Sequence, residues 1–425
     1  MHPTSIGDQN NTRKVFFEGT HRTSHPNETF ARISPFQRMI GVTRIANVTG
    51  LDRIGIPVCL AVRPNARSLA TAQGKGVTLE AARVSALMES LEVWHAERVA
   101  LPRQVGTYAK LRRDGVSVVD ITRLPMQPGA SLSEDEPVEW IAGFDLVSQE
   151  SMLVPFDAVS LDLTPPFGEK PLAFSVSSNG LASGNCWVES IVHAVCELIE
   201  RDACALWFLE PIALRKPRQI AISTITDPTC ERIVQQIEMA GLRIALWDMT
   251  SNIGIPAYAS LVMEDAATPY AGSVSFCAGY GCHLSSAVAA CRALCEAVQT
   301  RLTMIAGSRD DLPQREYLRT TDQAAWRRVY NDATCPPPEA MFVDRSLAGD
   351  LFEADLTQLI GRLQSIGIDQ IVVVDLTQPD IALPVVKVII PGLEGPPFLS
   401  GYTPGIRALV HRMMLSRRGV WAGVS

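Results

Sequence analysis

The sequence predicts an α+β protein with a mixed α/β body, in which strands, glycine-containing turns and long helices alternate. Two observations predict this class. Short β-rich runs bounded by Gly, Asp and Pro occur near both ends of the chain, and three longer segments between them share a helical apolar period and one register. A chain of 425 residues with 47% hydrophobic content is long enough to bury one large core or two ordinary ones.

The charge balance argues against nucleic acid as a main partner. The chain has 45 acidic and 38 basic residues, which gives a net charge of −7, and no long run of Lys or Arg interrupts this balance. The start of the chain is polar, and no apolar stretch approaches the roughly 18 to 20 residues that span a bilayer. We therefore expect a cytoplasmic protein without a membrane segment.

The elements follow in order along the chain. Residues 1–36 show little periodicity and are rich in Thr, Asn and His, so we expect an extension that becomes ordered on a partner. The body, residues 37–425, begins with RIANVTGLDRIGIPVCLAVRP at 44–64, where a Gly/Asp turn divides two β-rich runs. Near its end, QIVVVDL at 370–376 and LPVVKVIIPG at 383–392 predict two further buried strands.

An internal repeat is the most informative feature. Each copy is a turn that enters a long helix, and the copies read GKGVTLEAARVSALMESLEVW at 74–94, SGNCWVESIVHAVCELIERD at 183–202 and GCHLSSAVAACRALCEAVQTR at 281–301. In this register, Glu89, Glu197 and Glu296 occupy one position. Three residues later come Glu92, Glu200 and Gln299, and four residues earlier come Ser85, His193 and Arg292. The register indicates that one strand, turn and helix unit is used three times.

Each predicted helix presents a polar line. At about 100° per residue, the side chains of the first helix at Ser85, Glu89 and Glu92 lie within roughly 60° of one another. The glutamates are embedded among Ala, Val, Leu, Ile and Cys, where an unpaired carboxylate costs several kcal/mol. Mg²⁺ is the natural counter-ion because it prefers oxygen ligands and completes its shell with water and phosphates. The glycine turns, with free N–H groups at a helix start, suit phosphate.

Other interpretations stay open beside this one. The same charges on a single helix are typical of a solvated or ion-paired face. The sequence has no Walker GxxxxGK[ST] pattern, no HExxH and no GxSxG. Its ten cysteines form no CxxC pair, and we interpret them as core thiols, although Cys291 and Cys295 lie one helical turn apart, as two ligands of a metal would.

At these residues the sequence resembles the YcaO superfamily, whose members bind ATP without a Walker motif, through glutamates on such helices. The resemblance runs from about Thr43 to Arg407 and includes DLTQPDIALPVVKVIIPGLEGP at 375–396. It implies that residues 37–425 form one YcaO domain, with repeated strand, glycine turn and helix units around an ATP and Mg²⁺ site. Only residues 1–36 fall outside it.

The resemblance also implies two sets of site residues. The implied Mg²⁺ ligands are Glu89, Glu92, Glu189, Glu197 and Glu200. The implied nucleotide contacts are Asn185, Arg201, Arg292 and Glu296, with Lys75, Ser178 and Arg44 as further candidates. No residue is assigned a catalytic role.

Family members use ATP to phosphorylate the oxygen of a peptide backbone amide, and the nucleophile that adds to the carbonyl decides the product. A Cys, Ser or Thr side chain gives an azoline, a backbone amide gives an amidine, and sulfide gives a thioamide. Azoline-forming members often end in a PxPxP tail, whereas this chain ends RRGVWAGVS. Its motifs are similar to those of YcaO proteins that work with a TfuA partner. We therefore expect thioamide formation in a ribosomally made peptide.

The resemblance further implies a homodimer and a peptide substrate. No separate peptide-recognition domain is visible, so a leader peptide would bind another chain or a groove in this one. Two alternatives remain. One is an azoline-forming cyclodehydratase, and the other is an accessory ATP-binding protein that assists methylthiolation of a ribosomal protein.

Overall fold

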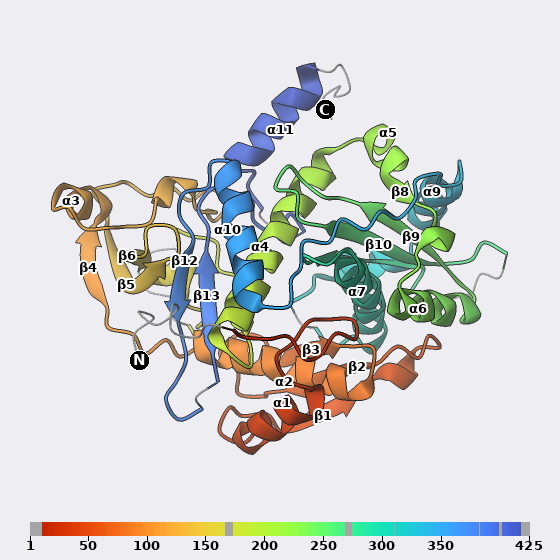
Figure 1. Ribbon diagram of the computed structural model, residues 1–425, viewed down its shortest axis with the longest axis horizontal. Coiled ribbons are helices and arrows are strands. Elements are labelled where there is room, and N and C mark those ends of the chain that lie inside the picture. The colour runs from red at the N-terminus through yellow and green to blue at the C-terminus, as the bar shows by residue number, and fades with distance from the viewer. Residues whose placement is uncertain are drawn as a thin grey trace.

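The computed structural model describes residues 11–165, 173–267, 274–309, 311–381, 383–398 and 402–417. Within these residues the strands form three antiparallel sheets, and helices pack against them (Figure 1). Helix α4 (Trp187–Leu209) lies in the middle of the molecule, between the sheet at the left of Figure 1 and the sheet at the right. The fold is α+β, as the sequence predicts.

The first sheet and its helix lie at the bottom of Figure 1. Its strands are β1 (Arg44–Asn47), β2 (Val58–Val62) and β3 (Thr71–Lys75), in the order β1-β2-β3. Helix α2 (Leu79–Ala96) follows and packs on β2 and β3. It begins at Thr78, whose side chain accepts a hydrogen bond from the Ala81 N–H, a normal N-cap. The two β-rich runs predicted at 44–64 are therefore β1 and β2.

The second sheet supports the third repeated helix. The strands are β8 (Gln219–Ile220), β9 (Leu242–Asp248), β10 (Ala257–Glu264) and β11 (Phe276–Cys282), in the order β11-β10-β9-β8. Helix α7 (Ser286–Ala306) covers one face, and α6 (Pro228–Met239) packs beside it. The short helices α8 (Gln314–Thr321) and α9 (Gln323–Thr334) follow α7 in the chain.

The third sheet contains the two C-terminal strands that the sequence predicts. Its strands are β4 (Gln104–Thr107), β5 (Pro137–Asp145), β6 (Glu150–Pro155), β7 (Leu181–Ser183), β12 (Val372–Asp375) and β13 (Val385–Ile389). Strands β12 and β13 pair with each other at its centre, where α4 packs on β13 and β7. Helix α10 (Phe352–Ser365) packs on the other side of α4 (Figure 1).

Two glycines show that the repeat is a structural one. A Cβ at Gly74 would lie 2.2 Å from the Ala82 carbonyl oxygen, eight residues later, and a Cβ at Gly281 would lie 2.1 Å from the Ala289 carbonyl oxygen, again eight residues later. In both units only glycine lets the last strand lie directly against the helix that follows. Equivalent strands and helices therefore pack in the same register in the first and third units.

The described part of the N-terminal extension packs on the body. Helix α1 (Pro26–Ile33) lies against α2, and Lys14 forms a buried ion pair of 2.6 Å with Asp355 of α10. Sequence patterning misses α1, although Pro26 at its first position and Glu28, which accepts a hydrogen bond from the His25 N–H, are helix-start signals. Residues 11–36 of the extension thus pack against helices of this chain, and the boundary between residues 36 and 37 stays a prediction.

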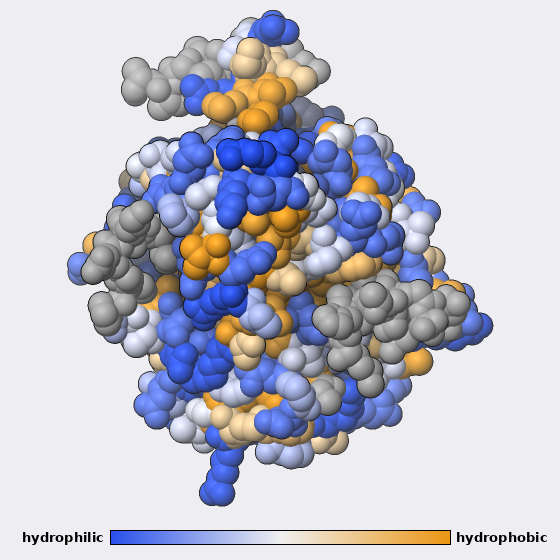
Figure 2. Space-filling view, turned by 90° about the vertical axis from the view of Figure 1, so that its left-hand side faces the viewer, coloured by the Kyte–Doolittle hydropathy of each residue, from blue (hydrophilic) through white to orange (hydrophobic). Residues whose placement is uncertain are grey.

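Most of the cysteines lie in the core. Eight of the ten are buried, as core thiols should be, while Cys186 is half-buried and Cys335 is exposed. No helix among the described residues is long and apolar enough to cross a bilayer. The short helices α3 (Tyr108–Arg113) and α5 (Ile212–Arg215) lie near the surface, and α11 (Ile406–Arg417) projects from the body. Figure 2 shows hydrophobic residues on this projecting helix at the top, above a mainly hydrophilic face.

Candidate functional site

The three repeated helices line one cavity of about 1170 Å³. Nine of the twelve predicted site residues lie in its wall: Lys75, Glu89, Glu92, Ser178, Glu197, Glu200, Arg201, Arg292 and Glu296. They come from α2, α4, α7 and the segments that precede α2 and α4. The tertiary fold therefore gathers polar lines that are separated by about a hundred residues in the sequence, and we call this part of the cavity the charged wall.

A second, smaller cavity of about 160 Å³ adjoins the first. The two cavities share Lys75, Ser85, Glu92, His193 and Arg292. Two further predicted site residues, Asn185 and Glu189, lie in the small cavity, which is also lined by residues of the N-terminal extension.

Arg44 is the one predicted residue outside both cavities. It lies at the start of β1, the edge strand of the first sheet, and its side chain is exposed. From this sheet it is Lys75 that reaches the site. Lys75 lies on β3, at the opposite edge of the sheet from Arg44, and it lines both cavities.

Cations from one unit pair with carboxylates from another. Lys75 Nζ lies 2.8 Å from Glu296 Oε2 and donates to Gln299 Oε1 at 3.1 Å, which joins the first unit to the third. Arg201 lies 3.1 Å from Glu200 on the same helix. Burial opposes the ionisation of Glu296, but Lys75 and Arg201 together hold its pKa below the ordinary value. Glu296 is therefore an ionised, paired carboxylate.

The other glutamates of the charged wall lack enough positive charge. Burial raises the pKa of Glu89 to about 7 and that of Glu92 to about 8, and it also raises the pKa of Glu197 and Glu200. Glu92 accepts hydrogen bonds from the Ser183 N–H at 2.8 Å and the Ser183 hydroxyl at 2.7 Å, which only partly offset its burial. Burial therefore favours the neutral forms of these carboxyl groups, and a bound cation would stabilise their ionised forms.

These residues fit Mg²⁺ in chemistry. Carboxylate oxygens are the ligands that Mg²⁺ prefers, and the ion usually takes one or two of them and fills its shell with water and substrate phosphates. Among the described residues, no three His, Cys, Asp or Glu side chains converge closely enough to hold a metal by themselves. Glu89 and Glu92 of α2 and Glu197 and Glu200 of α4 line the same cavity, an arrangement that suits ions shared between protein and phosphates.

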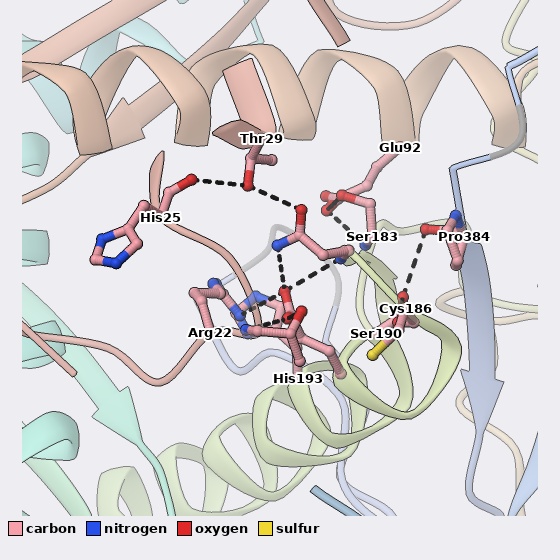
Figure 3. A network of polar contacts seen from close by, with 12 residues as sticks. Arg22, His25, Thr29, Glu92, Ser183, Cys186, Ser190, His193 and Pro384 are labelled. Atoms are coloured by element: carbon pink, nitrogen blue, oxygen red, sulfur yellow. Dashed lines mark hydrogen bonds and ion pairs between the residues drawn. The ribbon is translucent and has the colours of Figure 1, made fainter. Parts of the chain in front are cut away.

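The small cavity contains a polar network that begins in the extension (Figure 3). The Thr23 N–H and hydroxyl donate to Glu189 Oε2 at 2.9 and 2.7 Å. The Asn185 N–H and side-chain amide donate to Glu189 Oε1, both at 3.2 Å, and the Thr29 hydroxyl donates to Asn185 Oδ1 at 2.8 Å. Both oxygens of Glu189 are thus engaged by protein donors, and a metal at Glu189 would exchange with them.

Arg22 and His193 add to this network. Arg22 lies 3.9 Å from Glu189 and lines the small cavity, and Figure 3 shows it beside His193. Burial and then the charge of Arg292 hold the pKa of His193 well below its usual range. His193 is therefore neutral, and its Nδ1 accepts a hydrogen bond from Arg292 Nη1 at 3.1 Å. This bond orients the Arg292 guanidinium at the junction of the two cavities.

Sequence reasoning missed the contribution of the extension. It placed Arg22, Thr23 and Thr29 in an arm without assigned contacts, whereas the structure places them around Asn185 and Glu189. The helix-start signal at Pro26 was available in the sequence, but nothing there indicates which distant helix the arm contacts.

The fold and the site define an α+β protein in which three repeated helices enclose one acidic cavity. Residues 73–394 match the family described as YcaO cyclodehydratase, ATP- and Mg²⁺-binding. The chain belongs to this YcaO family, and ATP and Mg²⁺ are its cofactors.

Two curated relatives cover nearly the whole chain. An uncharacterized protein in the tfuA 3′ region of Rhizobium leguminosarum bv. trifolii is 36% identical over 92% of this chain and 93% of its own length. An uncharacterized protein of Methanothermobacter thermautotrophicus is 34% identical over 87% of this chain and 94% of its own length.

Two solved structures share the fold. A heterocyclase in complex with substrate and cofactor superposes on this chain with a TM-score of 0.75 at 22% sequence identity. The match covers 93% of this chain but only 55% of the length of the heterocyclase chain. YcaO from Methanopyrus kandleri, bound with AMPPCP and Mg²⁺, superposes with a TM-score of 0.69 at 24% identity and covers 90% of this chain and 95% of its own.

Proposed function

We propose that this protein phosphorylates the oxygen of a backbone amide in a ribosomally made peptide, and that external sulfide then replaces this oxygen to give a thioamide. A TfuA-type protein is the proposed partner, and a homodimer is the proposed assembly. One observation carries the proposal: this YcaO chain, which is similar to a protein of a tfuA 3′ region, encloses a cavity in which burial raises the pKa of Glu89 and Glu92, so that a bound cation would stabilise their ionised forms.

The charged wall suits the phosphates of ATP. In this proposal the Mg²⁺ ligands are Glu89, Glu92, Glu189, Glu197 and Glu200. Bound ATP supplies the phosphoryl group that turns the amide oxygen into a leaving group, and Mg²⁺ shields its charge. Arg201, Arg292 and Lys75 then contact phosphate oxygens, because each guanidinium or ammonium group faces the same cavity as the carboxylates. Glu296 and Gln299 hold Lys75 for this role.

The small cavity suits the nucleobase. Its wall combines the apolar side chains of Ala81, Val84 and Met88 with the polar groups of Asn185 and Arg22. A flat aromatic base needs such apolar sides and a few hydrogen-bonding groups at its edge. In this arrangement His193 stays neutral and keeps Arg292 pointed at the junction, where the phosphates begin.

Azoline formation is the second candidate. It is favoured by the family's description as a cyclodehydratase. Thioamidation is favoured by the similarity to the relative in the tfuA 3′ region of Rhizobium leguminosarum.

Mass spectrometry separates these products. A precursor peptide encoded nearby is incubated with this protein, the TfuA-type partner, Mg-ATP and sulfide. We expect a gain of about 16 Da per modified amide, because sulfur replaces oxygen, and no gain when ATP is omitted. A loss of about 18 Da identifies cyclodehydration instead, and an unchanged mass with intact ATP binding leaves the accessory function.

A further inference from the structure

The large cavity extends well beyond its charged wall. The length of the site can be followed along helix α4, because side chains from its start to its end line the two cavities. Asn185 and Glu189, at its start, line the small cavity, Glu197, Glu200 and Arg201 form the middle, and Phe208 lines the large cavity near its end. At 1.5 Å per residue, Glu189 and Phe208 are about 28 Å apart along the helix. The two ends of the site are therefore distinct places.

The far end is lined by aromatic side chains, and we call it the aromatic groove. Its residues are Trp207, Phe208, Trp247, Phe276, Tyr280 and Phe398. The Tyr280 ring stacks on Phe398 at 5.9 Å and meets Phe208 edge-on at 6.1 Å. Arg201, which pairs with Glu200, lies over the Phe398 ring at 5.0 Å. Arg201 thus marks the border between the charged wall and the aromatic groove.

The groove uses the second face of the β8–β11 sheet. Gly279 and Gly281 face α7, which covers the first face. Trp247, Ala259 and Tyr280 form one cross-strand row on the opposite face. The second face of an antiparallel sheet is usually polar when it meets solvent. Here part of this face packs against α9 around Trp326, and the remainder lines the cavity with aromatic side chains, as the walls of ligand pockets often do.

Three side chains at the mouth of the groove are unusually exposed for apolar residues. Phe208, Ile212 and Phe398 are 44%, 45% and 49% exposed, and all three line the large cavity. The small cavity is lined by residues of the extension, among them Arg22 and Thr29. The exposed rings give a peptide a direct route from solvent to the aromatic end of the large cavity.

We propose that the aromatic groove binds the peptide residues next to the modified amide, and that it selects aromatic or large aliphatic side chains. This inference rests on the proposed function. An amide that reaches the phosphates at the charged wall has its neighbouring residues on the adjoining surface of the same cavity, and that surface is the groove. Transfer of apolar side chains onto these rings supplies the binding free energy.

The test uses two uncharged peptides, Ac-Gly-Phe-Leu-Gly-NH2 and Ac-Gly-Ser-Asn-Gly-NH2, with the full-length protein saturated with Mg²⁺ and a non-hydrolysable ATP analogue. Saturation-transfer NMR gives their relative affinities. We expect the apolar peptide to bind about tenfold more tightly and Phe208→Glu to abolish this preference. The matched control is Met239→Glu, since Met239 is 82% exposed at the end of α6 and lies outside both cavities.

Two outcomes would overturn the inference. Equal binding of the two peptides removes the selectivity. Binding of the apolar peptide that is tighter without the ATP analogue than with it shows that the analogue competes for the groove, so that the groove holds the nucleobase. The affinity of each variant for the Mg²⁺–analogue complex is measured separately. If the wild type does not bind the Mg²⁺–analogue complex, the proposed function is contradicted. If it binds this complex but binds the two peptides equally, only the proposed peptide binding at the aromatic groove is contradicted.

Discussion

Lys75 Nζ lies 2.8 Å from Glu296 Oε2, so an ion pair joins the strand before the first repeated helix to the third repeated helix. The two residues are separated by 221 positions in the sequence. This contact fixes the distance between two sides of the charged wall and gives it a cation that remains partly exposed to the cavity.

Lys75→Met is expected to weaken Mg-ATP binding about tenfold, because it removes a cation from the charged wall and breaks the ion pair between Lys75 and Glu296. Isothermal titration calorimetry measures the change. Arg44→Ala is the matched control, since it removes a cation from an exposed position outside both cavities, and its affinity should equal that of the wild type. If Arg44→Ala weakens binding as much as Lys75→Met, the cavity assignment is wrong.

Glu200→Gln is expected to reduce the response to Mg-ATP without lowering the stability of the ligand-free protein. Burial raises the pKa of Glu200, so the ionised form is penalised in the metal-free protein at neutral pH, and the neutral variant should be at least as stable. Mg-ATP should raise the thermal midpoint of the wild type, and the rise should vanish with a chelator and be much reduced in the variant. A variant with a lower midpoint without ligand and an unreduced response to Mg-ATP would show that Glu200 has a structural role.

Thr23→Val tests the extension. The substitution removes the hydroxyl bond to Glu189 but keeps the backbone bond and the side-chain shape. We expect faster hydrogen exchange in residues 11–25 and a free energy of unfolding that is lower by roughly 1.5 kcal/mol or more, because one hydrogen bond to a charged group is lost. Thr357→Val, an exposed change on α10 that removes only a bond to the Glu353 carbonyl, should change neither quantity.

Gly281→Ala tests the repeated strand–helix contact. The added Cβ would lie 2.1 Å from the Ala289 carbonyl oxygen, so α7 must move away from β11, and we expect a loss of about 3 kcal/mol in the free energy of unfolding. Gly361→Ala in α10 meets nothing within 4 Å and should instead stabilise the protein by about 1 kcal/mol through helix propensity. Urea denaturation measures both. Equal effects would mean that the contact is not tight in solution.

His95 predicts a pH dependence of stability. It is fully buried in α2, its Nδ1 lies 2.8 Å from the Leu91 carbonyl oxygen, and burial lowers its pKa from 6.5 to about 4. The unfolded chain therefore takes up the proton first, and stability is lost as the pH falls from about 6.5 to about 4. Relative to His95→Gln, the wild type should lose up to about 3 kcal/mol over this window in denaturation experiments. Parallel pH profiles would argue against a neutral, buried histidine.

Local patterns in the sequence were sufficient for the repeated units. Glycines next to an apolar helical period predict α2, α4 and α7, and β-branched runs predict β1, β2, β12 and β13. The same patterns place the glutamates on one face of each helix, because a residue's direction on a helix depends only on its position in the turn. The cavity wall of Glu89, Glu92, Glu197 and Glu200 was therefore predictable before its geometry was known.

The sequence by itself thus determined the helices, their polar faces and the charge that a cation must offset. Only the tertiary structure decided which sides face each other: that Lys75 pairs with Glu296, that Thr23 contacts Glu189, that Arg44 lies outside, and that aromatic residues continue the cavity beyond the charges. The physical reason is that periodicity is a local property, whereas a contact across 166 or 221 residues depends on how whole sheets and helices pack.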